Sequence, residues 1–168
     1  MAAIILRPVG PGDEAEFLKA AVASAGLLEP WVYLPETPAQ FTDYLARFDG
    51  VGGVGFVVCL EADGSIVGFV NINQIFRRSL ERGILGFGAF EAGHARGIMS
   101  EAVRRTVAYG FGELGLHRLE ADIQPANVRS KRLVERLGFR CEGLSPAYLR
   151  INGVWRDHER WAITAGNG

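Results

Sequence analysis

Two spacings of apolar residues divide the chain into strands and helices. Short runs rich in Val, Ile and Phe, bounded by turn residues, predict strands. They cover residues 4–9, 54–60, 65–74, 84–90 and 117–123. The last third of the chain adds two strands joined at Asn152-Gly153, because this dipeptide is typical of a two-residue hairpin turn.

Apolar residues that recur every three or four positions predict the helices. Asp13 is expected to cap the first helix, and Thr37, which precedes a proline, opens the second. The third begins at Ser100, and the fourth runs from Asn127 to Gly138. The expected order is β-α-α-β-β-β-α-β-α-β-β. It predicts an α/β (α+β) fold, in which a mixed central β-sheet of about seven strands has helices on both faces.

Length and composition limit the classes of protein. With 168 residues, 48% of them hydrophobic, and no repeat or linker, the chain is expected to form a single domain over 1–168. Eighteen Lys and Arg against nineteen Asp and Glu leave a formal net charge of −1, so we expect neither nucleic acid nor a membrane as partner. Without a signal-like start or a long apolar run, the expected location is cytoplasmic.

The two cysteines give no sign of a metal or redox site. Cys59 lies in an apolar run and Cys141 lies in the segment FRCEG, and neither has a second cysteine or a histidine at metal-binding spacing. We therefore expect two buried thiols and no metal site.

A glycine-containing stretch before the helix at Ser100 is the main candidate for a binding site. The first N–H groups of a helix have no partner within it, and such loops commonly bind an anion there. A Walker loop would end in Gly-Lys-Ser/Thr, but two apolar residues follow Gly97. A Rossmann fingerprint fits at Gly86 and Gly88 only, since Glu91 takes the place of its third glycine.

Three local patterns, in this order along the chain, resemble the GNAT superfamily of acyl-CoA-dependent N-acyltransferases, and within it the RimJ/RimL-like branch. HARGIM followed by Ser-Glu-Ala resembles the family's pyrophosphate loop, Q/R-x-x-G-x-G/A. NVRSKRLVERLGF resembles the branch's N-x-x-S segment, and INGVWRDHERWAI resembles its closing hairpin. The resemblance implies a GNAT fold and transfer of an acyl group, with acetyl-CoA as the expected donor, to a primary amine by direct attack on the thioester. The acceptor would be a protein N-terminal α-amine or a small-molecule amine, and a homodimer is left open.

The resemblance also implies a coenzyme A site built largely from main-chain groups. His94 stands where the family prefers Gln or Arg, and Met99 where it prefers Gly or Ala, but the N–H groups of roughly Arg96 to Ser100 do not depend on side chains. The strand at 84–90 is expected to splay from its parallel neighbour, so that pantetheine lies between them. The implied cofactor-binding residues are Phe87, Gly88, Ala89, Phe90, His94, Ala95, Arg96, Gly97, Ile98, Met99, Ser100, Asn127, Arg129 and Arg132, with Lys131 a further candidate for the phosphates.

Two residues are implied in catalysis. Many GNAT enzymes protonate the leaving thiolate with a tyrosine four residues before the Gly-Phe pair, but that position is Val134 here. The branch instead offers Ser130 as donor to the sulfur, with Asn127 as a ligand of the acceptor or of pantetheine. Helix capping by the same pair is the structural alternative, and both roles can hold together.

The sequence does not single out a general base. The candidates are Glu120, Asp122, Glu142, Asp157 and His158. An α-amine, with a pKa of ~7.7–8.0, loses its proton at a lower free-energy cost than a lysine amine, with a pKa of ~10.4. The lack of a clear general base therefore favours an α-amine acceptor. The acceptor pocket is expected between residues 27–36 and the final hairpin, with Trp31, Tyr33 and Tyr148 in its walls.

Two other classes stay open on the sequence. A non-catalytic acyl-CoA-binding module would explain His94, Met99 and the missing base, whereas a nucleotide-dependent oxidoreductase would explain the glycines alone. Binding of acetyl-CoA in preference to NAD would exclude the second class, and turnover would exclude the first.

Overall fold

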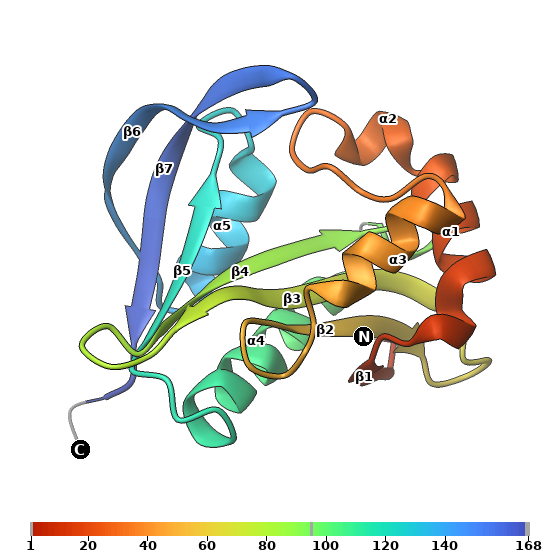
Figure 1. Cartoon of the computed structure of the whole chain (residues 1–168), viewed down its shortest axis with the longest axis horizontal. Helices are drawn as coiled ribbons and strands as arrows, with labels where there is room; N and C mark the ends of the chain where they lie inside the picture. Colours follow the sequence, from red (N-terminus) through yellow and green to blue (C-terminus); the bar gives the residue numbers. More distant parts are fainter. Residues whose placement is uncertain (1, 95, 167–168) are drawn as a thin grey trace.

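In the computed structural model, which describes residues 2–94 and 96–166, a seven-stranded sheet separates two groups of helices (Figure 1). The strands are β1 (Ile4–Pro8), β2 (Val54–Leu60), β3 (Ile66–Phe76), β4 (Arg82–Ala89), β5 (Arg118–Ile123), β6 (Arg140–Ile151) and β7 (Val154–Thr164). They lie in the order β1-β2-β3-β4-β5-β7-β6. The neighbours β4 and β5 run parallel and the other neighbouring pairs antiparallel, which confirms the expected mixed sheet.

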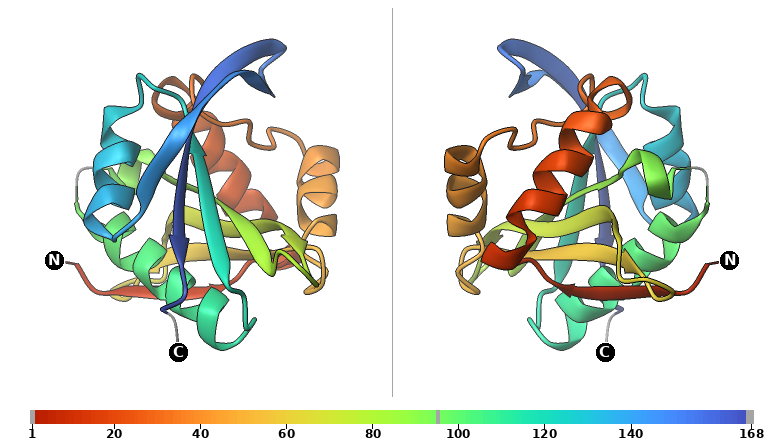
Figure 2. Two further views of the ribbon diagram at one scale, coloured as in Figure 1. Left: turned by 90° about the vertical axis from the view of Figure 1, so that its left-hand side faces the viewer. Right: turned by 90° about the vertical axis from the view of Figure 1, so that its right-hand side faces the viewer.

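The helices cover both faces of this sheet. They are α1 (Glu14–Ala23), α2 (Ala25–Leu28), α3 (Pro38–Ala46), α4 (Ile98–Gly112) and α5 (Val128–Arg136). Figure 2 shows α4 and α5 on one face and α1 and α3 on the other. The short helix α2 was not predicted, and α4 begins two residues before the expected start at Ser100. The earlier start follows from Gly97, whose φ of +73° lets the chain turn directly into the helix.

The two predicted helix caps have different outcomes. Thr37 caps α3 as expected, because its hydroxyl accepts a hydrogen bond from Gln40 N–H at 3.3 Å, while the Gln40 side chain accepts one from Thr37 N–H at 3.2 Å. Asp13 makes no side-chain cap bond to α1. Its carboxylate instead accepts hydrogen bonds from Gly10 N–H at 2.9 Å and from the Arg7 guanidinium at 2.7 and 2.9 Å. The competing cation explains why the predicted cap is wrong.

Replacing Asp13 with asparagine should reduce the stability of the fold in a pH-dependent way. The hydrogen bonds from Arg7, and then the one from Gly10, lower the pKa of Asp13 against the opposing effect of burial. Because the folded pKa lies below the unfolded value of ~3.9, the stabilisation is present above that pH and is lost as the pH falls through the folded pKa. Near neutral pH we expect the free energy of unfolding to fall by about 1 kcal/mol. This is the value for a hydrogen bond to a charged group, reduced because Arg7 is partly exposed and solvent screens the pair. Urea unfolding of the wild type and the Asp13→Asn variant near pH 7 and pH 3 measures this difference in the free energy of unfolding. An equal difference at both pH values would contradict a stabilising role for the charged Asp13 carboxylate.

The core has one apolar layer on each face of the sheet. The layer beneath α4 and α5 includes Met99, which is 8% exposed and turns inward. The other layer is aromatic, with Phe17 and Phe41 fully buried beside strand residues. Cys59 is buried there as expected, but Cys141 is exposed. The prediction for Cys141 is wrong because β6 is an edge strand whose residues 140–144 are all exposed.

Candidate active site

The pairing between β4 and β5 stops after three residue pairs. It runs from Arg82 and Arg118 to Ile84 and Glu120. Beyond this point β4 stays paired with β3 as far as Ala89, and β5 stays paired with β7 to its end. The two parallel strands therefore separate after Ile84, which is the splay that the sequence resemblance implies.

A cleft of about 380 Å³ lies at this opening, within the usual range for a small-molecule site. Its walls come from the segment around α2, the second half of β4, the glycine-containing loop with the first turn of α4, the end of β5, and α5. The predicted site residues that line it are Trp31, Phe87, Gly88, Ala89, His94, Gly97, Met99, Ser100, Asn127, Arg129 and Ser130. The loop, the splayed strand and the N-x-x-S segment thus meet in one place.

Several predicted cofactor-binding side chains lie away from this cleft in the described part of the chain. Phe90 is 1% exposed against Phe17, and its N–H donates to a carbonyl of β3. The Ile98 side chain is buried in the core, and those of Arg96 and Arg132 are exposed. Lys131 pairs with Glu159 at 3.0 Å. Ala95 lies outside the described residues.

Two of the three predicted acceptor residues also lie elsewhere. Tyr33 is 58% exposed and lines a separate pocket of about 260 Å³. Tyr148 packs beneath the Arg160 guanidinium, whose carbon lies 5.0 Å from the ring centre, and beside His158. Trp31 alone of the three lines the main cleft. The three aromatic residues therefore lie in three different environments, which depend on how α2 and the hairpin pack.

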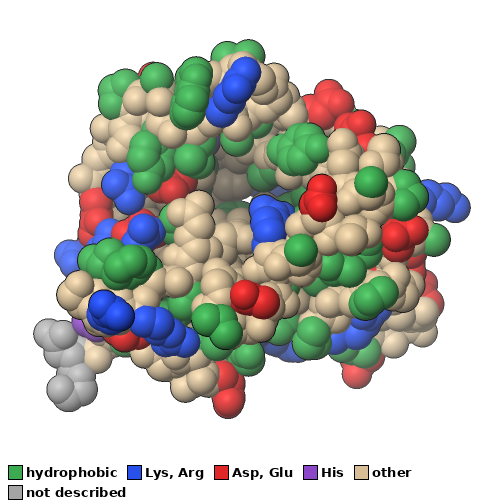
Figure 3. Space-filling view, viewed as in Figure 1, with side chains coloured by type: hydrophobic (Ala, Val, Ile, Leu, Met, Phe, Trp, Pro, Cys, Tyr) green, Lys and Arg blue, Asp and Glu red, His purple; other side chains and the backbone are tan. Residues whose placement is uncertain are grey.

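The segment after α2 is held over the cleft by two side chains from distant parts of the chain. Gln124, just after β5, donates to the Pro30 carbonyl at 2.5 Å, and Asn152, in the β6–β7 turn, donates to the Glu29 carbonyl at 2.7 Å. Figure 3 shows the surface hollowed between this hairpin and α2. The expected proximity of residues 27–36 and the final hairpin is therefore present.

The exposed edge of β4 directs main-chain donors into the opening. Phe90 N–H bonds the Val67 carbonyl on β3 at 2.9 Å. Because donors alternate along a strand, the N–H groups of Phe87 and Ala89 point to the opposite edge, toward the cleft. Gly88 is required for close packing here, since a Cβ on it would lie 2.9 Å from the Phe69 ring.

The start of α4 supplies donors at another part of the cleft. Ser100 N–H bonds the Gly97 carbonyl at 3.3 Å, and the first-turn N–H groups of Ile98 and Met99 have no partner within an α-helix. Met99 fits where the family prefers a small residue because its thioether packs inward beside Gly68.

Two arginines of α5 line the cleft near these donors. Arg129 contacts the His94 ring, and the Arg136 guanidinium lies 3.5 Å from the Ser100 hydroxyl. Arg136 was missed on the sequence. Its spacing of seven residues from Arg129 is the signal that could have found it, because that spacing returns to the same face of a helix.

The start of α5 confirms the predicted helix cap, and the cap bond does not use the two polar groups that the catalytic prediction requires. The Asn127 side-chain carbonyl accepts a hydrogen bond from Ser130 N–H at 3.2 Å. This bond uses neither the Asn127 NH₂ group nor the Ser130 hydroxyl. Both residues line the cleft, so capping and a role at the thioester are compatible.

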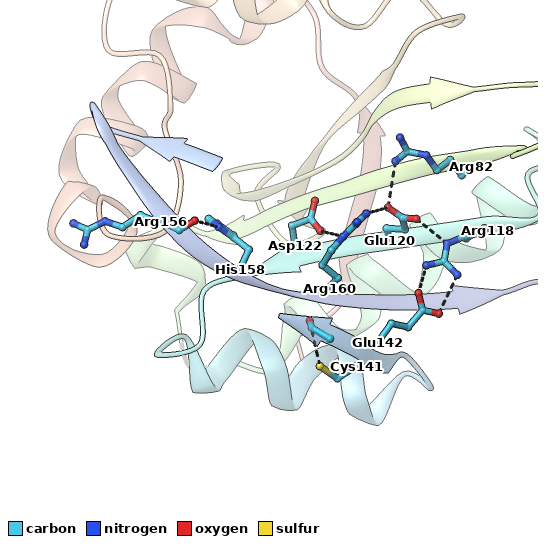
Figure 4. A network of polar contacts seen from close by, with 10 residues as sticks. Arg82, Arg118, Glu120, Asp122, Cys141, Glu142, Arg156, His158 and Arg160 are labelled. Carbon is cyan, nitrogen blue, oxygen red and sulfur yellow. Dashed lines mark hydrogen bonds and ion pairs between the residues drawn. The ribbon is translucent and has the colours of Figure 1, made fainter. Parts of the chain in front are cut away.

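Four of the five candidate bases, Glu120, Asp122, Glu142 and His158, lie among the polar contacts of β5, β6 and β7 in Figure 4. Glu120 is saturated, since it accepts from Arg82 at 3.2 Å, from Arg118 at 2.7 Å and from Arg160 at 3.1 Å. Glu142 is exposed and pairs with Arg118, which lowers its pKa. Asp122 differs from both, because it is one of the residues that line the cleft.

The remaining two candidates lie outside the cleft lining. The Asp157 carboxylate is exposed and accepts from Ala147 N–H at 2.8 Å. His158 is 2% exposed, and its Nδ1 contacts the Arg156 carbonyl at 2.9 Å. Of the five candidates, Asp122 is the one that the described structure brings to the cleft.

Residues 2–94 and 96–166 contain neither a cluster of metal ligands nor a helix able to span a membrane. No group of three or more His, Cys, Asp and Glu side chains there could hold a metal ion. No helix in this part of the chain is both long and apolar enough to cross a membrane.

Comparison with known proteins agrees with this geometry. Residues 3–140 match the family model of the acetyltransferase (GNAT) domain. The chain is 39% identical over 124 residues to the probable N-acetyltransferase YjcK of Bacillus subtilis, covering 74% of this chain and 68% of that protein. It is 36% identical over 99 residues to the ribosomal protein uS5-alanine N-acetyltransferase of Escherichia coli, covering 59% of this chain and 51% of that protein.

The structural comparison covers almost the whole chain. Mycobacterium smegmatis RimJ in complex with CoA-disulfide superposes with a TM-score of 0.89 at 29% identity, over 98% of this chain and 83% of that one. The family model, the sequence relatives and this structure all point to the same family and branch. The chain belongs to the GNAT acetyltransferase family and is an N-acetyltransferase similar to the RimJ-like enzymes.

Proposed function

We propose that this enzyme transfers the acetyl group of acetyl-CoA to the α-amine of a protein N terminus or to a small amine of similar pKa, with coenzyme A in the cleft between β4 and β5. The observation that carries the proposal is the early end of β4–β5 pairing, which brings free strand donors, a helix start and the N-x-x-S segment to one cleft. The relatives support it, since one is a RimJ structure with CoA-disulfide and another is named for acetylation of an alanine of ribosomal protein uS5.

The binding groups divide by their chemistry. The N–H groups of Phe87 and Ala89 suit the carbonyl oxygens of pantetheine and of the thioester, because they lie along an unpaired strand edge. The first-turn N–H groups of α4 suit the pyrophosphate, and Arg129 and Arg136 add positive charge beside them. The bound donor supplies an activated acyl group, and these residues hold its carbonyl at a fixed position.

The catalytic proposal assigns one role each to Ser130 and Asn127. Ser130 donates its hydroxyl proton to the departing sulfur, and Asn127 uses its free NH₂ group to hold pantetheine or the acceptor. Trp31, which lines the cleft beside α2, forms a wall for the acceptor.

The enzyme should acetylate free N-terminal α-amines faster than lysine side chains. The α-amine pKa of ~7.7–8.0 leaves a much larger unprotonated fraction near pH 7.5 than the lysine value of ~10.4, so we expect kcat/KM to be at least severalfold higher. A free-thiol assay with a peptide that has a free N terminus, against the same peptide with a blocked N terminus and an internal lysine, measures the ratio. A clear preference for the blocked lysine peptide would refute the α-amine assignment. Tight binding of acetyl-CoA without thiol release from any amine would show a non-catalytic module instead.

A further inference from the structure

Asp122 lies where β5 loses its contact with β4. The last parallel pair is Ile84 with Glu120, so Asp122 would lie opposite Gly86 if the pairing continued. Side chains alternate along a strand, so Asp122 shares a face with Glu120 and Ile84. The register of β3 and β4 places Asn73 on that face too, which is the side covered by α1 and α3. Asp122 therefore borders the opening on the side away from α4 and α5.

The Asp122 carboxylate is buried and incompletely satisfied. Its side chain is 4% exposed, yet its Oδ1 atom accepts no hydrogen bond from any described residue. The Arg160 Nε atom lies 3.5 Å away and forms an ion pair with Oδ1 without a hydrogen bond. Buried carboxylate oxygens nearly always have a donor, so the Asp122 carboxylate retains unused hydrogen-bonding capacity at a residue that lines the cleft.

A second polar side chain lies beside Gly86 on β3. The Asn73 side-chain nitrogen is 3.3 Å from the position that a Cβ on Gly86 would occupy, and the Oδ1 atom of the same amide has no hydrogen-bond partner among the described residues. A protonated amine, with three N–H donors, supplies the kind of donor that the Asp122 and Asn73 side chains lack.

The surroundings favour proton acceptance at Asp122. The titratable groups that face it are Glu120 on its own strand and His158 and Arg160 on β7. The segment after α2 adds apolar side chains to this cleft, and its other charged groups, His94, Arg129 and Arg136, come from the α4 loop and α5. Burial raises the pKa of Asp122, an effect that Arg160 opposes and Glu120 reinforces. Glu120 also holds the Arg160 guanidinium at 3.1 Å, which limits its pairing with Asp122.

We propose that Asp122 is the catalytic base, which receives the ammonium group of the acceptor beside Gly86 and removes its proton. This inference rests on the proposed function. The ammonium donates one proton to the Asp122 carboxylate, the freed electron pair of nitrogen forms a bond to the thioester carbonyl carbon, and the C–S bond breaks. The sulfur takes the Ser130 hydroxyl proton, and the second proton lost by nitrogen restores that hydroxyl through solvent. Asp122 releases its proton to solvent, so the reaction yields an amide, a thiol and one free proton.

The test is Asp122→Asn, which keeps the size of the side chain but cannot accept the proton. Near pH 7, kcat with an α-amine peptide should fall about 10²-fold while the Kd for acetyl-CoA stays unchanged. The loss should shrink as the pH rises through the amine pKa of ~8, because the free amine no longer needs a base. Asp122→Glu should recover part of the activity, and Glu142→Gln, which removes an exposed carboxylate of the same network, should stay within about twofold of wild type.

The proposal would be overturned by a folded Asp122→Asn enzyme with kcat within about twofold of wild type, or by a loss that is constant from about pH 7 to pH 9.5. If the variant does not fold, as judged by its Tm, the wild-type enzyme still provides a test. With a saturating α-amine peptide, its kcat should stay nearly constant as the pH falls from about 9 to below the amine pKa of ~8, because Asp122 removes the proton from the bound ammonium, and a tenfold decline per pH unit beginning at ~8 would reject the base. If the proposed function is wrong, the wild-type enzyme will release no thiol with any α-amine. That result would also exclude a catalytic role for Asp122.

Discussion

Replacing Ser130 with alanine should lower kcat about 10²-fold and leave acetyl-CoA affinity nearly unchanged. Ser130 lies in the first turn of α5 and lines the cleft together with residues of the unpaired edge of β4. General acids contribute roughly 10²–10⁴-fold, and the low end applies because a thiolate with a pKa near ~8.5 leaves readily even without a proton. Steady-state thiol release at saturating substrates, with calorimetric titration of acetyl-CoA, measures both quantities.

The same substitution separates catalysis from helix capping. The cap bond is donated by the main-chain N–H of Ser130, which alanine retains, so the stability of the variant should change by less than ~1 kcal/mol. Ser130→Thr keeps a hydroxyl and should retain more activity than the alanine variant. Asn127→Ala removes the cap acceptor itself and should cost ~1 kcal/mol in urea unfolding. A well-folded Ser130→Ala enzyme with kcat within about twofold of wild type would remove the hydroxyl from the mechanism.

Replacing Gly97 with valine should weaken acetyl-CoA binding by about 10- to 100-fold. Gly97 has φ of +73°, and a β-branched residue in this region costs roughly 1–3 kcal/mol, which the loop relieves by moving. Such movement turns the N–H groups of Ile98 and Met99 away from the pyrophosphate. No described atom lies within 4 Å of the position of a Cβ on Gly97, so the expected effect is conformational rather than a clash within the protein.

Two further variants test that explanation. Gly97→Asn should lose less affinity than Gly97→Val, because asparagine tolerates a left-handed conformation. His94→Ala should weaken binding only modestly, since its exposed ring contacts Arg129 and the main chain supplies the principal donors. Calorimetry measures the dissociation constant of acetyl-CoA for each variant. Small, equal effects of Gly97→Val and His94→Ala would show that the phosphates do not bind at the start of α4.

Features that depend on neighbours along the chain were predictable from the amino-acid sequence alone. Thr37 with Gln40 forms the predicted cap of α3, and Asn152-Gly153 forms the predicted turn, with both φ angles positive at 48° and 82°. Asn127 caps α5, and Gly138 follows its end with φ of +94°. These outcomes were predictable because each depends on hydrogen bonds or backbone angles within a few residues.

The tertiary structure decided which of these local features share a site. Glu120 and Asp122 lie two residues apart on one face of one strand, and no local pattern separates them. Three arginines from β4, β5 and β7 saturate Glu120, whereas the end of β4–β5 pairing leaves Asp122 at the cleft with an unsatisfied oxygen. Phe90, Cys141 and Tyr148 were misplaced for the same reason. Their environments depend on strand order and on side chains that arrive from distant parts of the chain, and periodicity within one segment carries no information about either.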